Sequence, residues 1–171
     1  MVAVTYKYDE TSNLLVANTD TEVVAKAESY TTTKEIVNDK NNDNVVEVGD
    51  LITYEIRTTV PFVSDGNPNE FWIADTLTGA QYYFEGNSVK GVAPKFTAEV
   101  AGVNIFTLGV EKPNPVAQDD VQKFEIDLTN LLTDENTYAG QEVIITYTAK
   151  VMAVDEITNT AISSNDPESD T

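Results

Sequence analysis

"LITYEIRTTV", residues 51–60, alternates apolar and polar side chains with the period of two that is typical of a β-strand. Ile52, Tyr54 and Ile56 fall on one face of this strand, because successive side chains of a strand point to opposite faces. A second stretch, "VIITYTAKV" (143–151), shows the same alternation. Both stretches therefore predict strands with one buried face.

Shorter strand-like stretches run along the rest of the chain, at 2–7, 13–17, 22–27, 33–37, 71–75, 81–84, 96–100, 103–108, 121–127 and 157–162. Polar turn residues separate many of them, at 38–44, 64–69, 85–87 and 111–115. One short helical turn is expected within 128–136. Many short strands divided by polar turns predict an all-β sandwich or barrel.

The composition excludes several classes of function. The chain has 171 residues, enough for one large domain or one domain with a short leader, and a net charge of −19 with only 10 basic residues. Nucleic acid and anionic membranes are therefore not expected as partners. No apolar run could span a bilayer, and no signal peptide is recognisable. The absence of cysteine and histidine excludes disulfides, thiolate zinc sites and histidine-based catalysis.

Oxygen-rich loops and acidic residues give no specific metal or hydrolase site. "NDKNNDN" (38–44) and "DGNPNE" (65–70) could offer oxygen ligands to calcium, but neither fits an EF-hand, and such residues are ordinary in turns. With 29 acidic residues, pairs of carboxylates arise by chance, so a glycosidase is not indicated. We expect no metal and no cofactor. A carbohydrate- or protein-binding module remains open.

Three polar residues share a strand face with apolar neighbours. Lys34 lies on the same face as Ile36, which we expect to be buried, and Asp75 and Asn159 likewise alternate with apolar residues in "FWIADTL" and "EITNTAI". Each has an ordinary explanation: a lysine can extend to solvent, an aspartate can cap a turn, and an asparagine can bind backbone groups. A buried charge without a partner is costly, however, so inward-facing polar groups should meet one another.

The segments "TKEIVND…VVEVGDLITYEIRTTVP", "FWIADTL" and "VIITYTAKV…TNTAISSNDP" together resemble the isopeptide-forming pilin domains of Gram-positive bacteria. These domains have an immunoglobulin-like β-sandwich of the collagen-adhesin type and occur in fimbrial backbone subunits and surface adhesins. The resemblance covers 30–167, with 1–29 as leading strands or the end of a preceding segment, and 168–171 as a linker.

The resemblance implies an intramolecular amide bond between a lysine on an early strand and an asparagine on the last strand, beside an acidic residue. By position, Lys34 matches the lysine, Asn159 the asparagine and Asp75 the promoting acid. Lys26 and Asn165 are a second lysine and a second asparagine near the two ends of the domain. Glu55 and Glu125 are alternative acids, although both face outward on their predicted strands. The bond would form once per molecule, so the protein would not be an enzyme with turnover.

The implied function is structural. The resemblance suggests a self-crosslinked stalk module of a pilus or adhesin, outside the cell and anchored to the cell wall. Its partners would be neighbouring pilin subunits or domains of the same surface protein, and a host extracellular-matrix ligand is also compatible. The alternative is an adhesin domain that binds a host matrix protein or glycan without an internal crosslink.

Overall fold

The computed structural model describes residues 6–9, 14–17, 32–38, 46–83, 96–118, 121–152 and 156–165. Strands β1 (Tyr6–Asp9) and β2 (Leu14–Ala17) pair with each other in an antiparallel two-stranded sheet. They fall within or beside the predicted stretches 2–7 and 13–17, whereas 2–5 and the predicted strand 22–27 lie outside the described residues.

The larger sheet is built around the two long strands that the sequence predicted. Its path runs through β3 (Thr33–Asn38), β4 (Leu51–Thr59), β11 (Glu142–Val151), β7 (Phe96–Val100) and β8 (Val103–Asn104). A short strand, β6 (Ala80–Tyr82), pairs with the end of β11, on residues that follow those paired with β7. All these pairs are antiparallel. In this order β3 forms one edge of the sheet.

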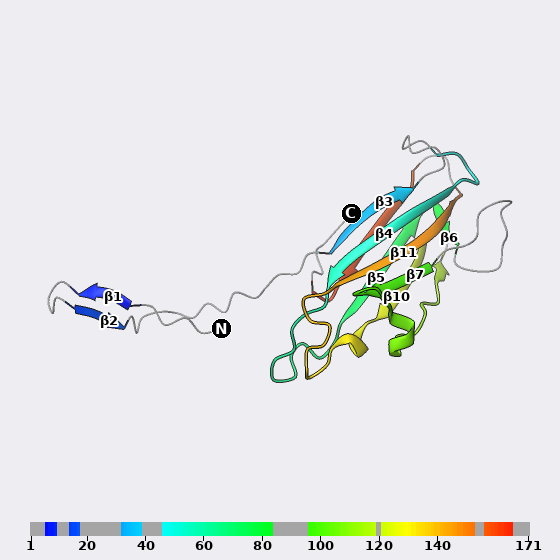
Figure 1. Cartoon of the computed structure of the whole chain (residues 1–171). Helices are drawn as coiled ribbons and strands as arrows, with labels where there is room; N and C mark the ends of the chain where they lie inside the picture. Colours follow the sequence, from blue (N-terminus) through cyan, green and yellow to red (C-terminus); the bar gives the residue numbers. More distant parts are fainter. Residues whose placement is uncertain are drawn as a thin grey trace.

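The smaller sheet contains β12 (Thr158–Ser163), β5 (Trp72–Thr78), β10 (Val121–Asp127) and β9 (Val116–Gln118), in that order and all antiparallel. The two sheets lie face to face, with the last strand, β12, beside the edge strand β3 (Figure 1). The predicted all-β sandwich is therefore confirmed.

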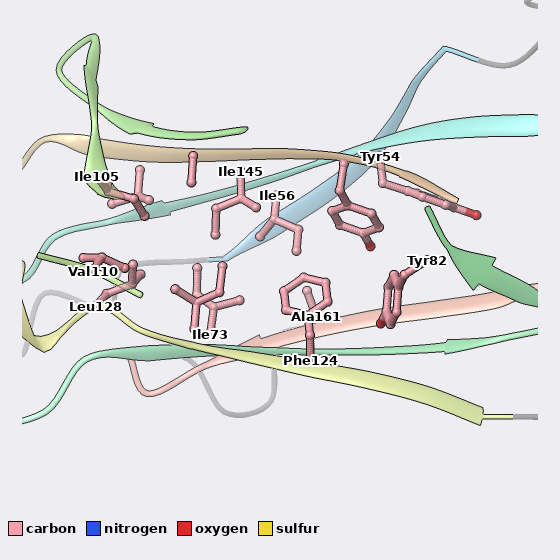
Figure 2. Packing of buried hydrophobic residues seen from close by; sticks show 14 of the residues in the cluster. Tyr54, Ile56, Ile73, Tyr82, Ile105, Val110, Phe124, Leu128, Ile145 and Ala161 are labelled. Atoms are coloured by element: carbon pink, nitrogen blue, oxygen red, sulfur yellow. The ribbon is translucent and has the colours of Figure 1, made fainter. Parts of the chain in front are cut away.

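The core fills the space between the sheets with side chains from both layers (Figure 2). Burial alternates along β4 and β5, as the period of two predicts, and Ile56, Ile73, Leu77 and Ile145 are fully buried. Each such side chain contributes about 1.5–3 kcal/mol of transfer free energy on burial. The same alternation places Asp75 on the inner face of β5, where it is buried among apolar neighbours.

One local prediction is wrong in detail, and another is confirmed. The stretch 103–108 continues as a strand only through β8, and Ile105–Leu108 form a 3₁₀ helix, η1. The side chain of Asn104 accepts a hydrogen bond from the Phe106 amide at 3.0 Å, which starts the helix, and Gly109 ends it at φ 87°. The expected helical turn within 128–136 is the 3₁₀ helix η2 (Thr129–Leu131). Within the described ranges, no helix is long and apolar enough to cross a bilayer.

The expected burial of Ile36 is also wrong. Lys34 and Ile36 do share a face, since they pair with Ile56 and Tyr54, whose side chains are buried. Ile36 is nevertheless 50% exposed. It lies on an edge strand, where the opposite sheet covers little of its side chain. Alternation therefore determines which face the side chain is on, but not how deeply it is buried.

Candidate functional site

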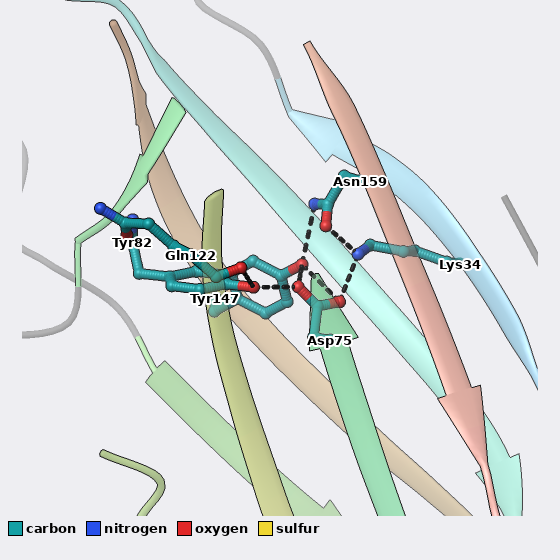
Figure 3. Close-up of polar contacts among 6 residues, drawn as sticks. All are labelled: Lys34, Asp75, Tyr82, Gln122, Tyr147 and Asn159. Atoms are coloured by element: carbon teal, nitrogen blue, oxygen red, sulfur yellow. Dashed lines mark hydrogen bonds and ion pairs between the residues drawn. The ribbon is translucent and has the colours of Figure 1, made fainter. Parts of the chain in front are cut away.

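Three strands bring Lys34, Asp75 and Asn159 together between the sheets (Figure 3). Lys34 comes from β3, at the edge of the larger sheet, and Asn159 from β12, at the adjacent edge of the smaller one. Asp75 lies on β5, which pairs with β12 so that Asp75 faces Ala161. Two strands 125 residues apart in the chain therefore meet at this site.

The amine of Lys34 is at the centre of the site. Its Nζ atom donates hydrogen bonds to Oδ2 of Asp75 and to Oδ1 of Asn159. The Lys34 side chain is only 5% exposed and that of Asp75 is fully buried. An amine, a carboxyl group and a carboxamide are therefore in direct contact with almost no access to bulk water.

Two tyrosine hydroxyls complete the polar cluster. Tyr82 donates a hydrogen bond to Oδ1 of Asp75 at 2.6 Å, and Tyr147 reaches the same carboxyl group at 2.9 and 3.0 Å. The amide Nδ2 of Asn159 donates to the Tyr147 hydroxyl at 2.8 Å. Asp75 thus reaches Asn159 through the Lys34 amine and the Tyr147 hydroxyl.

Aromatic rings enclose the amine. The Nζ atom of Lys34 lies 5.4 Å from the ring centroid of Tyr54 and 5.5 Å from that of Tyr147. The ring of Tyr147 in turn packs edge-on against Phe124 and Tyr82, with centroids 5.4 and 5.6 Å apart. These tyrosines were missed as site residues. Alternation put Tyr54 and Tyr147 on core faces, but a strand pattern does not say which core positions of different strands meet.

Burial shifts the two ionisable groups towards their neutral forms. Desolvation lowers the pKa of Lys34 to about 8, although the nearby carboxyl group of Asp75 opposes this change. Desolvation likewise raises the pKa of Asp75, against the opposing effects of Lys34 and the tyrosine hydrogen bonds. The site therefore favours an uncharged amine beside a protonated carboxyl group more than water would.

The alternative residues have other places in the structure. Asn165 donates a hydrogen bond from Nδ2 to the carbonyl oxygen of Thr59 at 2.9 Å, just beyond the end of β12. Glu55 faces outward and binds Arg57 at 2.7 Å, and Glu125 is exposed on β10. Lys26 lies outside the described residues. None of the three described alternatives lies in the cluster around Lys34.

A second polar contact joins the same strands farther along. The buried hydroxyl of Thr32, just before β3, binds the hydroxyl of Ser163 in β12 at 2.7 Å and that of Thr58 in β4 at 3.1 Å. It therefore fixes the position of β3 against β12 two residues before Lys34.

A groove opens beside the cluster. It has a volume of about 340 Å³ and is lined by residues of β3 and β4 and by the segment 157–160, including Lys34, Ile36, Tyr54 and Asn159. The half-exposed Ile36 forms part of its wall. The groove therefore borders the Lys34 and Asn159 side of the cluster.

Neither the family models nor the curated protein sequences match the chain. Solved structures do match its fold. The major pilin SpaA of Corynebacterium diphtheriae has a TM-score of 0.56 at 16% identity over 82% of this chain and 33% of that one. The major pilin SpaD of the same organism has a TM-score of 0.50 at 16% identity over 83% of this chain and 32% of that one.

The chain thus spans about a third of the length of these two pilins. The structure of SpaA points to a modular pilus assembly and to stabilising isopeptide bonds in that protein. At such low identity the likeness concerns the arrangement of strands and not the site residues. The β-sandwich described above has the fold of a domain of Gram-positive major pilins.

Proposed function

We propose that this β-sandwich is a structural module of a Gram-positive surface pilus or adhesin, and that an amide bond between Lys34 and Asn159 crosslinks it. The observation that carries the proposal is the buried contact of the Lys34 amine with both the Asp75 carboxyl group and the Asn159 carboxamide. The fold shared with major pilins supports the same assignment.

The chemistry follows from the positions of these groups. An uncharged Lys34 amine is a nucleophile, and its contact with Oδ1 of Asn159 puts it beside the carbonyl carbon of that amide. Holding the two groups together replaces an encounter in solution by a reaction within one folded chain. The Nζ–Cγ bond forms, the Cγ–Nδ2 bond breaks, and ammonia leaves. Asp75 gives up its proton and takes one back during the reaction. The reaction happens once, so the protein is not an enzyme with turnover.

A bond at this place would serve a stalk module. It would join β3 to β12, so a force that pulls on the two ends of the sandwich would pass through a covalent link at residues 34 and 159. The segment between Lys34 and Asn159, which are 125 positions apart, would then be shielded from extension. The natural setting of such a module is an extracellular fibre or adhesin, with neighbouring subunits or domains of the same surface protein as partners.

Intact mass of the purified chain tests the bond. We expect a mass one ammonia below that of the sequence, and a Lys34–Asn159 linked peptide after proteolysis. Lys34→Ala, Asn159→Ala and Asp75→Ala should each restore the full mass. The matched controls are Asn165→Ala and Glu125→Ala, which should stay linked. A wild-type chain with its full mass would refute the crosslink and leave the uncrosslinked binding module as the better reading.

A single-molecule pulling experiment tests the stalk role separately. The linked domain should resist extension between residues 34 and 159, whereas the Asn159→Ala variant should unfold to its full length. Full extension of a domain whose mass shows the link would mean that the bond joins other residues.

A further inference from the structure

We propose that Tyr147 is a catalytic residue of this crosslinking reaction, and that its hydroxyl carries a proton from Asp75 to the amide nitrogen of Asn159 that leaves as ammonia. The inference rests on the proposed Lys34–Asn159 bond and adds a residue that the match of lysine, asparagine and acid does not include. It accounts for how the leaving nitrogen becomes protonated inside a buried site.

The geometry puts the Tyr147 hydroxyl between donor and acceptor. It is 2.8 Å from Nδ2 of Asn159 and 2.9 and 3.0 Å from the two carboxyl oxygens of Asp75. The two contacts of the Asn159 amide define its orientation, because Lys34 Nζ donates to Oδ1 and Nδ2 donates to the Tyr147 hydroxyl. Nδ2, the leaving nitrogen, therefore points at Tyr147. The carboxyl group of Asp75 reaches that nitrogen through this hydroxyl (Figure 3).

The proton path reverses during the reaction. Before attack, Nδ2 is a planar amide nitrogen that donates to Tyr147, and Tyr147 donates to Asp75. When the Lys34 lone pair forms the Nζ–Cγ bond, the carbonyl π pair moves to Oδ1 and the carbon becomes tetrahedral. Nδ2 then has an amine-like lone pair and can accept a proton.

The transfers balance in three moves. Tyr147 gives its hydroxyl proton to Nδ2 and takes the carboxyl proton of Asp75. The Asp75 carboxylate then removes one proton from the new Nζ cation. The oxygen pair re-forms the carbonyl, the Cγ–Nδ2 bond breaks, and neutral ammonia leaves. Tyr147 and Asp75 both end as they began, and no oxidant, reductant or metal is needed.

The surroundings suit Tyr147 to this role. Its side chain is fully buried, and the rings of Tyr54, Tyr82 and Phe124 around it fix its orientation. Burial first, and then the charge of Asp75, raise the pKa of Tyr147, so the hydroxyl stays protonated until the leaving nitrogen needs a proton.

Tyr82 provides a natural comparison. Its hydroxyl binds Oδ1 of Asp75 at 2.6 Å, and its second acceptor is the carbonyl oxygen of Gln122 at 3.4 Å. It approaches Asp75 from the side of β10 (Figure 3). Tyr82 is therefore a positioning residue that orients the carboxyl group, while Tyr147 touches a reacting atom.

The test is the rate of linking in Tyr147→Phe, with Tyr82→Phe as the matched control. Each chain is collected unlinked in denaturant directly after synthesis and diluted to refold. Fluorescence of Trp72, the single tryptophan, follows folding, and mass spectrometry of quenched samples follows the loss of ammonia. We expect Tyr147→Phe to link at least about 100-fold more slowly than wild type, and Tyr82→Phe at most about tenfold more slowly.

A second readout separates proton transfer from packing. At fixed pH and ionic strength, linking of Tyr147→Phe should speed up with the concentration of imidazole buffer, because the groove borders Asn159 and the leaving nitrogen has lost its internal proton donor. Wild-type linking should be insensitive to it. If the Phe variant does not fold, wild-type rates in mixtures of light and heavy water replace it: a relay of several protons predicts a curved dependence on deuterium content.

The outcomes are distinct. Linking of Tyr147→Phe at the wild-type rate, or equal slowing of both variants without an effect of buffer, would overturn the relay and leave the crosslink intact. A linear isotope dependence would overturn it as well. A wild-type chain that never loses ammonia would remove the crosslink itself and the relay with it.

Discussion

The double variant Lys34→Met/Asp75→Asn should lack the crosslink, and its new side chains should keep the site filled and uncharged. Neutral groups in place of a buried ion pair are often tolerated, so the local cost should be small. The main loss is then the closed loop of 125 residues between Lys34 and Asn159. Chain entropy assigns about 5 kcal/mol to a loop of that size, through the unfolded state. In a domain of this size that corresponds to a fall in melting temperature of roughly 15 °C.

Thermal and urea unfolding measure this effect, with Lys123→Met/Glu125→Gln on the exposed face of β10 as the matched pair. The control should change stability by no more than about 0.5 kcal/mol. The linked wild type should also show a smaller urea m-value than the double variant, because its unfolded state is more compact. The wild type in this comparison must show the mass of the linked chain. A melting temperature of the double variant less than about 5 °C lower, or equal m-values of the two chains, would then refute the loop argument.

Three further predictions concern the surroundings of the crosslink. In the unlinked variant Asp75→Asn, the free energy of unfolding should rise by about 2 kcal/mol between pH 8 and 9.5. Burial keeps the pKa of Lys34 at about 8 or below, so over this range the unfolded chain binds a proton that the folded chain lacks. Urea titrations measure the rise, and the variant Lys34→Met/Asp75→Asn should not show it. In the same unlinked variant, Thr32→Val should lower the free energy of unfolding by about 1–2 kcal/mol, because it removes the hydroxyl that binds Thr58 and Ser163. An unchanged urea midpoint would contradict this. Gly79→Ala should lower the melting temperature more than Gly49→Ala, because both positions have positive φ but only at Gly79 would the new Cβ meet the Glu156 carbonyl oxygen; equal losses would show that φ alone matters.

The sequence predicted well those elements whose burial alternates along a long strand. Residues 121–127 form β10 with the predicted bounds, and β4 and β11 differ from prediction by one residue. The inward face of Asp75 also followed from alternation with apolar neighbours in β5. In these strands every second side chain is buried by the opposite sheet, so local pattern and tertiary packing agree.

The rest depended on which strands become neighbours. β9 was not predicted, because its three residues, Val116–Gln118, are all exposed and carry no alternation of burial. Ile36 lies at a sheet edge, which no local pattern reveals. The meeting of Tyr82 and Tyr147 at Asp75 joins both sheets of the sandwich, and only the topology brings them together.

The neighbouring positions of β3 and β12 have a consequence for recovery after damage. Folding of β-sandwiches is slow because strands far apart in sequence must find each other. β3 and β12 make such a long-range contact in this domain. Once Lys34 and Asn159 are joined, these two strands stay together even when the domain unfolds. The search that limits renaturation is then shortened at each later cycle, so the crosslinked module should regain its native state faster than it first acquired it.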